Sequence, residues 1–183
     1  VYRHELVRLY VGERFAPAAT VMLLLLLSEI IGKSYSMAFK TAIAKGRVRF
    51  FSVTGLIFEF TNLGLTVVLV GLFGMGAVGS ALSTAVISVT VQAAVVIPYS
   101  LRLAEVSVSA WLRETVLPGY LPGAITFVCA VALKSVTPAI ESWPVMILHG
   151  FGISVLYLFL VYALGFKDGD LRDIRHALTV LAA

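Results

Sequence analysis

Residues 18–43 read AATVMLLLLLSEIIGKSYSMAFKTAI, a stretch long enough to cross a bilayer that nevertheless carries an opposite-charge pair. Glu29 and Lys33 lie four residues apart with the acid first, a spacing that places both side chains on one helix face and favours their attraction. Ser36 and Lys40 continue the same line. A soluble helix would be polar over its outer face, whereas this segment is apolar over most of its circumference. The stretch therefore predicts a membrane helix whose polar seam faces a polar interior.

The composition of the whole chain agrees with a membrane protein. Of its 183 residues 60% are hydrophobic and only 13% charged, and the mean hydropathy is +0.98. The single cysteine, Cys129, lies in an apolar stretch and excludes a disulfide framework or a thiolate metal cluster built from this chain alone. The net charge of +4 comes from basic residues near expected helix ends, so it does not indicate a nucleic-acid partner. The chain begins at Val1 instead of Met, and we expect a piece of a longer protein.

The hydropathy pattern predicts an all-α, polytopic transmembrane helix bundle of about five spanning helices within residues 17–166. After the first span, further spans are expected at residues 50–72, 77–99, 116–135 and 145–165. The segment Val1 to Ala16 is expected to be amphipathic or the end of a preceding helix. Residues 167–183 are expected to form an amphipathic tail on the membrane surface.

The connections between the later spans carry their own expectations. Residues 101–115 are polar enough to predict a loop, with a short interfacial helix beginning near Trp111. Pro118 and Pro122 are expected to kink the first turns of the fourth span. The third span carries Gly76, Ser80, Thr84 and Ser88 at intervals of four, a ladder interpreted as a packing surface for a neighbouring helix.

The second span has a polar seam of its own, in which small or polar residues recur at steps of three and four: Ser52, Gly55, Glu59, Asn62 and Thr66. An ionised side chain in a span costs roughly 2.5–3.5 kcal/mol or more, so Glu29, Lys33 and Glu59 must be paired, protonated or facing water. In one interpretation Glu29 and Lys33 form only a structural pair. In the favoured one, two successive helices with matching seams line a polar cavity, whose substrate or ion pathway comprises Glu29, Lys33, Ser36, Glu59 and Asn62.

Basic residues are distributed unequally between the two sides of such a bundle. One side carries nine, including Lys40, Lys45, Arg47 and Arg49, and the other carries four. The positive-inside rule places the first side, and with it the C-terminus, in the cytoplasm. The basic turn at residues 44–49 is interpreted as a topology signal, with contact to lipid phosphates as the alternative.

The sequence contains no recognisable catalytic constellation. The glycines at 71, 74, 76 and 79 lack the Lys-Ser/Thr pair of a phosphate-binding loop. The three histidines lie on different segments, which argues against a metal site. We therefore expect a protein that is not an enzyme and that needs no cofactor.

Three stretches resemble polysaccharide flippases, members of the superfamily of multidrug, oligosaccharidyl-lipid and polysaccharide exporters. Residues 6–32 are similar to the segment in which a helix end and a short turn precede a span. Residues 41–86 resemble the region where a basic turn leads to a span with Asn-Leu and then to a small-residue turn, here Gly76 to Thr84. Residues 101–124 are similar to the linker and proline-started helix that follow.

The resemblance implies a C-terminal part of a two-lobe exporter that works by alternating access. The implied substrate is an undecaprenyl-pyrophosphate-linked glycan, flipped across the bacterial inner membrane, with Lys33 meeting the pyrophosphate and Glu29 or Glu59 balancing charge or coupling to an ion. The implied partners are this lipid-linked glycan, membrane lipids and an N-terminal lobe of the same protein. Three alternatives stay open: a cation-coupled multidrug exporter of the same superfamily, a membrane-bound transferase acting on polyprenyl-phosphate sugars, and a non-transporting membrane scaffold.

Overall fold

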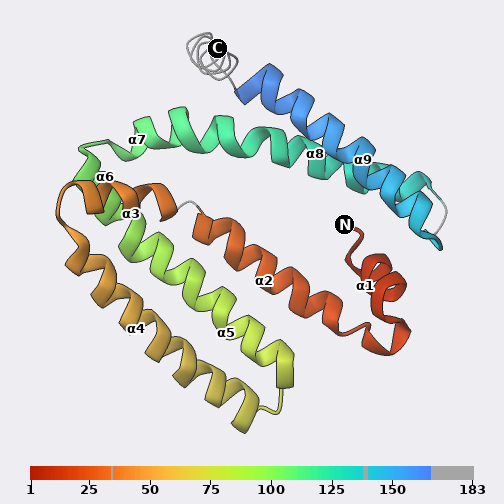
Figure 1. The fold of residues 1–183 in the computed structure, drawn as a ribbon, viewed down its shortest axis with the longest axis horizontal. Coiled ribbons are helices and arrows are strands. Elements are labelled where there is room, and N and C mark those ends of the chain that lie inside the picture. Colours follow the sequence, from red (N-terminus) through yellow and green to blue (C-terminus); the bar gives the residue numbers. More distant parts are fainter. Residues whose placement is uncertain (34, 138–139, 166–183) are drawn as a thin grey trace, which may run out of the picture. The chain divides into compact units, whose positions relative to one another are not determined.

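The computed structural model describes residues 1–33, 35–137 and 140–165; the side chains of residues 31–38, 41 and 165 lie outside this description. Within the described residues the chain is helical and contains no strand, which confirms the all-α prediction. The residues divide into two compact units at Ser107 and Val108 (Figure 1). We describe each unit by itself.

The first unit is built around α5 (Gly76–Val91), which lies between α2 (Ala18–Lys33) and α4 (Val48–Val67) (Figure 1). Helix α5 contacts both α2 and α4, and its buried residues are all small: Gly79, Ala81, Ser83 and Ala85. A Cβ atom added at Gly79 would lie 2.8 Å from the Cβ of Met75, so no larger residue fits there without a shift. This span therefore packs through small residues, but through others than the predicted ladder, in which Gly76 and Ser80 are exposed.

Shorter elements complete this unit. The chain begins with α1 (Arg3–Val11) and a 3₁₀ turn at Glu13–Phe15, and α1 contacts α2. Beyond α2, α3 (Tyr35–Ala44) contacts α4 and α6 (Ile97–Ala104). Phe50 of α4 stacks on Tyr99 of α6 with ring centroids 3.6 Å apart, and Phe51 meets both Phe39 and Tyr99 edge to face. This aromatic cluster joins α3, α4 and α6 at one end of the unit.

The first predicted span is described except at residue 34. Residues 18–43 were expected to form one spanning helix, and the described residues on either side of residue 34 are helical, as α2 and α3. Residue 34 lies outside the described residues, so one continuous span over this stretch stays a prediction. Among the described residues four helices are long and apolar enough to cross a membrane, at Val48–Leu72, Gly76–Ala104, Val108–Val136 and Trp143–Leu164.

The second unit is a helical hairpin. Its first arm joins α7 (Val108–Trp111), a π-helical turn at Leu112–Val116 and α8 (Leu117–Val136) into one helix of 29 residues. Its second arm is α9 (Trp143–Leu160), extended by a π-helical turn at Val161–Gly165, and it packs against α8. The expected amphipathic tail at residues 167–183 lies outside the described residues.

Two expectations for the connection between the third and fourth spans are wrong. Residues 101–115 do not form a loop, because α6 continues to Ala104 and the next helix begins at Val108. Trp111 belongs to the start of that long helix and not to a separate interfacial one. The real turn is only residues 105–107, where Glu105 has a φ of 59° and the N–H of Val106 donates to the carbonyl of Leu101 at 3.0 Å. This backbone hydrogen bond ends α6 within a short turn. The polar residues from Val108 onward can therefore belong to the next helix.

Prolines within the spans coincide with wider helical turns. A π-helical turn at Gln92–Val96 precedes Pro98, and the one at Leu112–Val116 precedes Pro118. Proline has no N–H to donate and its ring crowds the preceding turn, so a locally wider turn accommodates it without ending the helix. Pro98 and Pro118 each follow such a turn, whereas Pro122 lies within α8, and the helices run on through all three.

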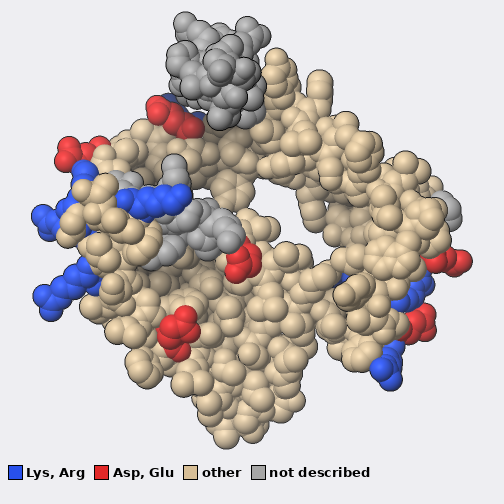
Figure 2. Space-filling view, in the orientation of Figure 1, with Lys and Arg blue, Asp and Glu red and all other residues tan. Residues whose placement is uncertain are grey.

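The surfaces of the spans are apolar and exposed, as a bilayer requires. Phe60 is 72% exposed, Leu72 80% and Phe151 68%. Water would penalise such surfaces, whereas lipid chains solvate them, so the chain is a membrane protein. Figure 2 shows long uncharged surfaces over the helices, with Lys and Arg gathered where α3, α6 and the start of α4 meet.

Candidate functional site

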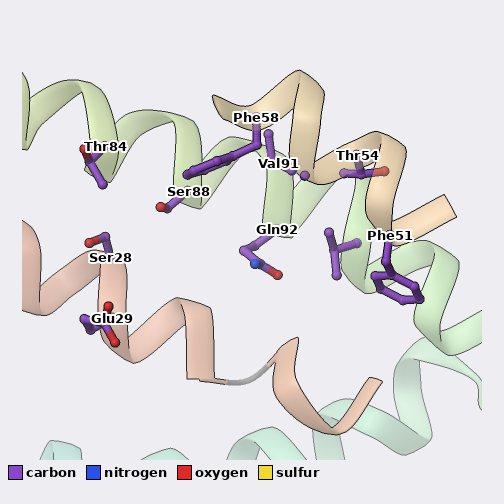
Figure 3. A pocket seen from close by; sticks show the side chains of 11 residues that line it. Ser28, Glu29, Phe51, Thr54, Phe58, Thr84, Ser88, Val91 and Gln92 are labelled. Carbon is purple, nitrogen blue, oxygen red and sulfur yellow. The ribbon is translucent and has the colours of Figure 1, made fainter. Parts of the chain in front are cut away.

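A pocket of about 330 Å³ lies within the first unit, between α2, α4 and α5 (Figure 3). Helix α2 contributes Ser28 and Glu29, and the other side is formed by α5 with the π-helical turn that follows it. The pocket is lined by Ser28, Glu29, Phe51, Thr54, Gly55, Phe58, Thr84, Ser88, Val91, Gln92 and Val96. It therefore combines one carboxylate, four hydroxyls and one amide with an apolar remainder.

The polar groups of α5 reach the pocket because of their spacing. Thr84, Ser88 and Gln92 follow one another at intervals of four, which places them on one helix face. Figure 3 shows Thr84 and Ser88 on the side of the pocket opposite Ser28, with Gln92 directed toward α2. Gln92 begins the π-helical turn at Gln92–Val96, and such turns occur frequently at functional sites.

Two of the hydroxyl groups that line the pocket already donate their proton within their own helices. The Ser28 hydroxyl donates its proton to the carbonyl of Leu25 at 2.7 Å, and the Thr84 hydroxyl donates to the carbonyl of Ser80 at 3.1 Å. A hydroxyl has only one proton, so lone pairs are what these groups can still offer. Together with the Glu29 carboxylate, they make the pocket suited to a ligand that donates hydrogen bonds or carries positive charge.

One end of the pocket is closed by the aromatic cluster. Phe51 and Val96, which line the pocket, are both 3% exposed and form a buried core with Ala42. Phe39, Phe50 and Tyr99 pack against that core. The polar pocket therefore has a rigid apolar wall on this side.

The residues predicted from the sequence are distributed over several places. Glu29 lines the pocket. Asn62 instead joins α4 to α5: the Ser83 hydroxyl donates to the Asn62 side-chain oxygen at 2.7 Å, and the Asn62 amide donates to Thr84 Oγ1 at 3.4 Å. Glu59 is exposed and is not among the lining residues. Lys33 and Ser36 lie on α2 and α3, and their side chains are outside the described ones.

The basic residues predicted as a topology or headgroup signal lie together at one end of the first unit. Lys40, Lys45, Arg47 and Arg49 are all exposed. The ammonium of Lys45 also donates to the carbonyl of Leu103 at 2.7 Å, so it satisfies a terminal carbonyl of α6. This contact favours a structural contribution from Lys45 in addition to its charge.

Several pocket residues were not predicted as site residues: Ser28, Thr54, Thr84, Ser88 and Gln92. The signal for three of them was present in the four-residue ladder of the third span, which was interpreted as packing alone. Continuing that ladder by one step reaches Gln92, a large amide that cannot serve close helix packing. An amide at the end of a small-residue ladder was thus the available indication of a pocket.

Comparison with known proteins yields no match to a family model, to a curated protein or to a solved structure.

Proposed function

We propose that this chain is part of a membrane transporter that flips a lipid-linked oligosaccharide across the bacterial inner membrane by alternating access. The observation that carries the proposal is the pocket between the helices of the first unit, whose lining combines a carboxylate, hydroxyls and an amide with apolar side chains. Polar groups are costly in a bilayer and mark substrate or ion pathways when they gather between helices. The proposed setting is a multi-pass protein of the inner membrane with a cytoplasmic C-terminus and a second, N-terminal lobe.

The lining of the pocket is suited to the glycan part of such a substrate. Sugar hydroxyls donate and accept hydrogen bonds, and the pocket offers a carboxylate, hydroxyl oxygens and the Gln92 amide. Its volume of about 330 Å³ lies within the range of small-molecule sites. No described residue of the pocket carries a positive charge that could bind a pyrophosphate. We propose that Lys33, one helical turn beyond Glu29, binds it.

The experiment measures flipping of a lipid-linked oligosaccharide in vesicles containing the full-length transporter. We expect Glu29→Gln and Gln92→Leu each to lower the flipping rate about tenfold, the effect of one lost polar contact to the carried molecule. The matched controls are Glu114→Gln, an exposed acid outside the pocket, and Ser154→Ala, whose hydroxyl bonds only within α9. Wild-type rates for both pocket variants would overturn the proposal.

A second candidate is a cation-coupled exporter of the same superfamily. The observation that favours it is the acceptor-rich character of the pocket, since a carboxylate with hydroxyl and amide oxygens can also hold a proton or a hard cation. The two candidates differ in their energy source and cargo. Drug efflux that collapses with the proton or sodium gradient, in vesicles without lipid-linked sugar, would favour the second candidate.

A further inference from the structure

Glu59 lies at the middle of a span, on a surface that the first unit leaves uncovered. It is the only acidic residue of α4, about 17 Å along the helix from Val48, which is close to half the thickness of the hydrocarbon core. Its side chain is exposed, and no hydrogen bond or ion pair joins it to another group of the described residues. Within the most apolar 18-residue window of this span no residue is buried. In Figure 2 an acidic side chain interrupts the uncharged surface over α4.

A carboxylate at this depth has to be paired, protonated or hydrated, and pairing needs a cation that the described residues of the first unit do not supply. A charged group in hydrocarbon is strongly disfavoured unless it is paired or hydrated. The pocket does not include Glu59. In the second unit the described basic residues of the long arm, Arg113 and Lys134, lie near the ends of that arm, and α9 has no lysine or arginine.

The helix surface around Glu59 can receive another helix at close range. Ser52 and Gly55 precede Glu59 by seven and four residues and are exposed on the same side of α4. A Cβ atom added at Gly55 would meet nothing within 4 Å. Small exposed residues one and two turns from a polar one are typical of surfaces where transmembrane helices approach closely.

We propose that the α4 surface formed by Ser52, Gly55 and Glu59 docks a transmembrane helix that carries a lysine or arginine at mid-depth. In the hydrocarbon the partner must be a helix, because a lipid-exposed segment has to satisfy its own backbone hydrogen bonds. It must be cationic there, because the charge that it compensates is the Glu59 carboxylate. Gly55 also lines the pocket, so this surface adjoins it, but the inference does not require the flipping function proposed there.

The test uses the whole chain reconstituted in phosphatidylcholine vesicles with a synthetic single-span polyleucine peptide that carries one central lysine. Energy transfer between a donor at the protein N-terminus and an acceptor on the peptide reports association, and a peptide with a central leucine gives the background. We expect Glu59→Gln and Glu59→Leu to weaken association with the lysine peptide about tenfold, the size expected of an interhelical polar contact. Glu114→Gln, which removes an exposed acid near a helix end, should leave association unchanged.

A charge exchange makes the test independent of any effect on folding. The Glu59→Lys variant should no longer associate with the lysine peptide. It should associate instead with a peptide that carries a central glutamate. Equal association of the lysine and leucine peptides with the wild-type chain would overturn the proposal. So would energy transfer between two labelled copies of the chain that Glu59→Gln abolishes, because the partner would then be a second copy.

Discussion

At the scale of single residues, Asn62 shows how one polar side chain can hold two membrane helices together. Ser83 is fully buried, and its hydroxyl donates to the Asn62 side-chain oxygen at 2.7 Å and to the Asn62 carbonyl at 2.9 Å. We expect Asn62→Leu to lower the free energy of unfolding in detergent by about 1–2 kcal/mol, because the buried hydroxyl loses its side-chain acceptor. Titration with a denaturing detergent measures this change.

The control at this scale is Thr61→Val. The Thr61 hydroxyl donates only to the carbonyl of Ile57 within α4, and the residue is exposed. Equal losses of stability for Asn62→Leu and Thr61→Val would contradict the cross-helix role of Asn62.

At the scale of elements, the aromatic cluster fixes α4 against α3 and α6. Phe51 is 3% exposed, and its ring lies 5.7 Å from that of Phe39 and 5.6 Å from that of Tyr99. We expect Phe51→Ala to destabilise the chain by about 3 kcal/mol, the usual cost of emptying a packed aromatic site. Phe60→Ala on the same helix, at a position 72% exposed, should cost far less in the same unfolding measurement. A comparable loss from both variants would show that Phe51 is not a packing centre.

At the scale of the whole molecule, the predicted membrane topology assigns a side to each connection. The helix Val108–Val136 has 29 residues and extends about 43 Å, which exceeds the hydrocarbon thickness. In a Cys129→Ala background, we therefore expect Val106→Cys to react with a membrane-impermeant thiol reagent only from the cytoplasmic side. Ser142→Cys should react only from the opposite side. Labelling of both from one side would contradict the spanning role of this helix, and exchanged sides would contradict the cytoplasmic C-terminus.

The sequence by itself determined that this protein is helical and belongs in a membrane. These properties depend on local hydropathy and on the length of apolar segments, which need no knowledge of tertiary contacts. It also identified Glu29 as a candidate site residue, since an acid in an apolar segment is unusual wherever that segment packs. The sequence predicted a long loop where the structure has only the turn of residues 105–107. Local polarity does not show how short a turn can be, because backbone hydrogen bonds can end one helix within a few residues of the next.

Only the tertiary structure decided which polar residues meet. The sequence interpretation joined Glu29 and Glu59 in one cavity because their helices follow each other among the predicted spans. In the structure α5 lies between α2 and α4, so Glu29 lines a pocket together with Thr84 and Ser88, whereas Glu59 is not among the lining residues; both acids are exposed. Helical periodicity assigns a residue to a face of its own helix, but the neighbour of that face is chosen by packing, here by the contact of α5 with both α2 and α4.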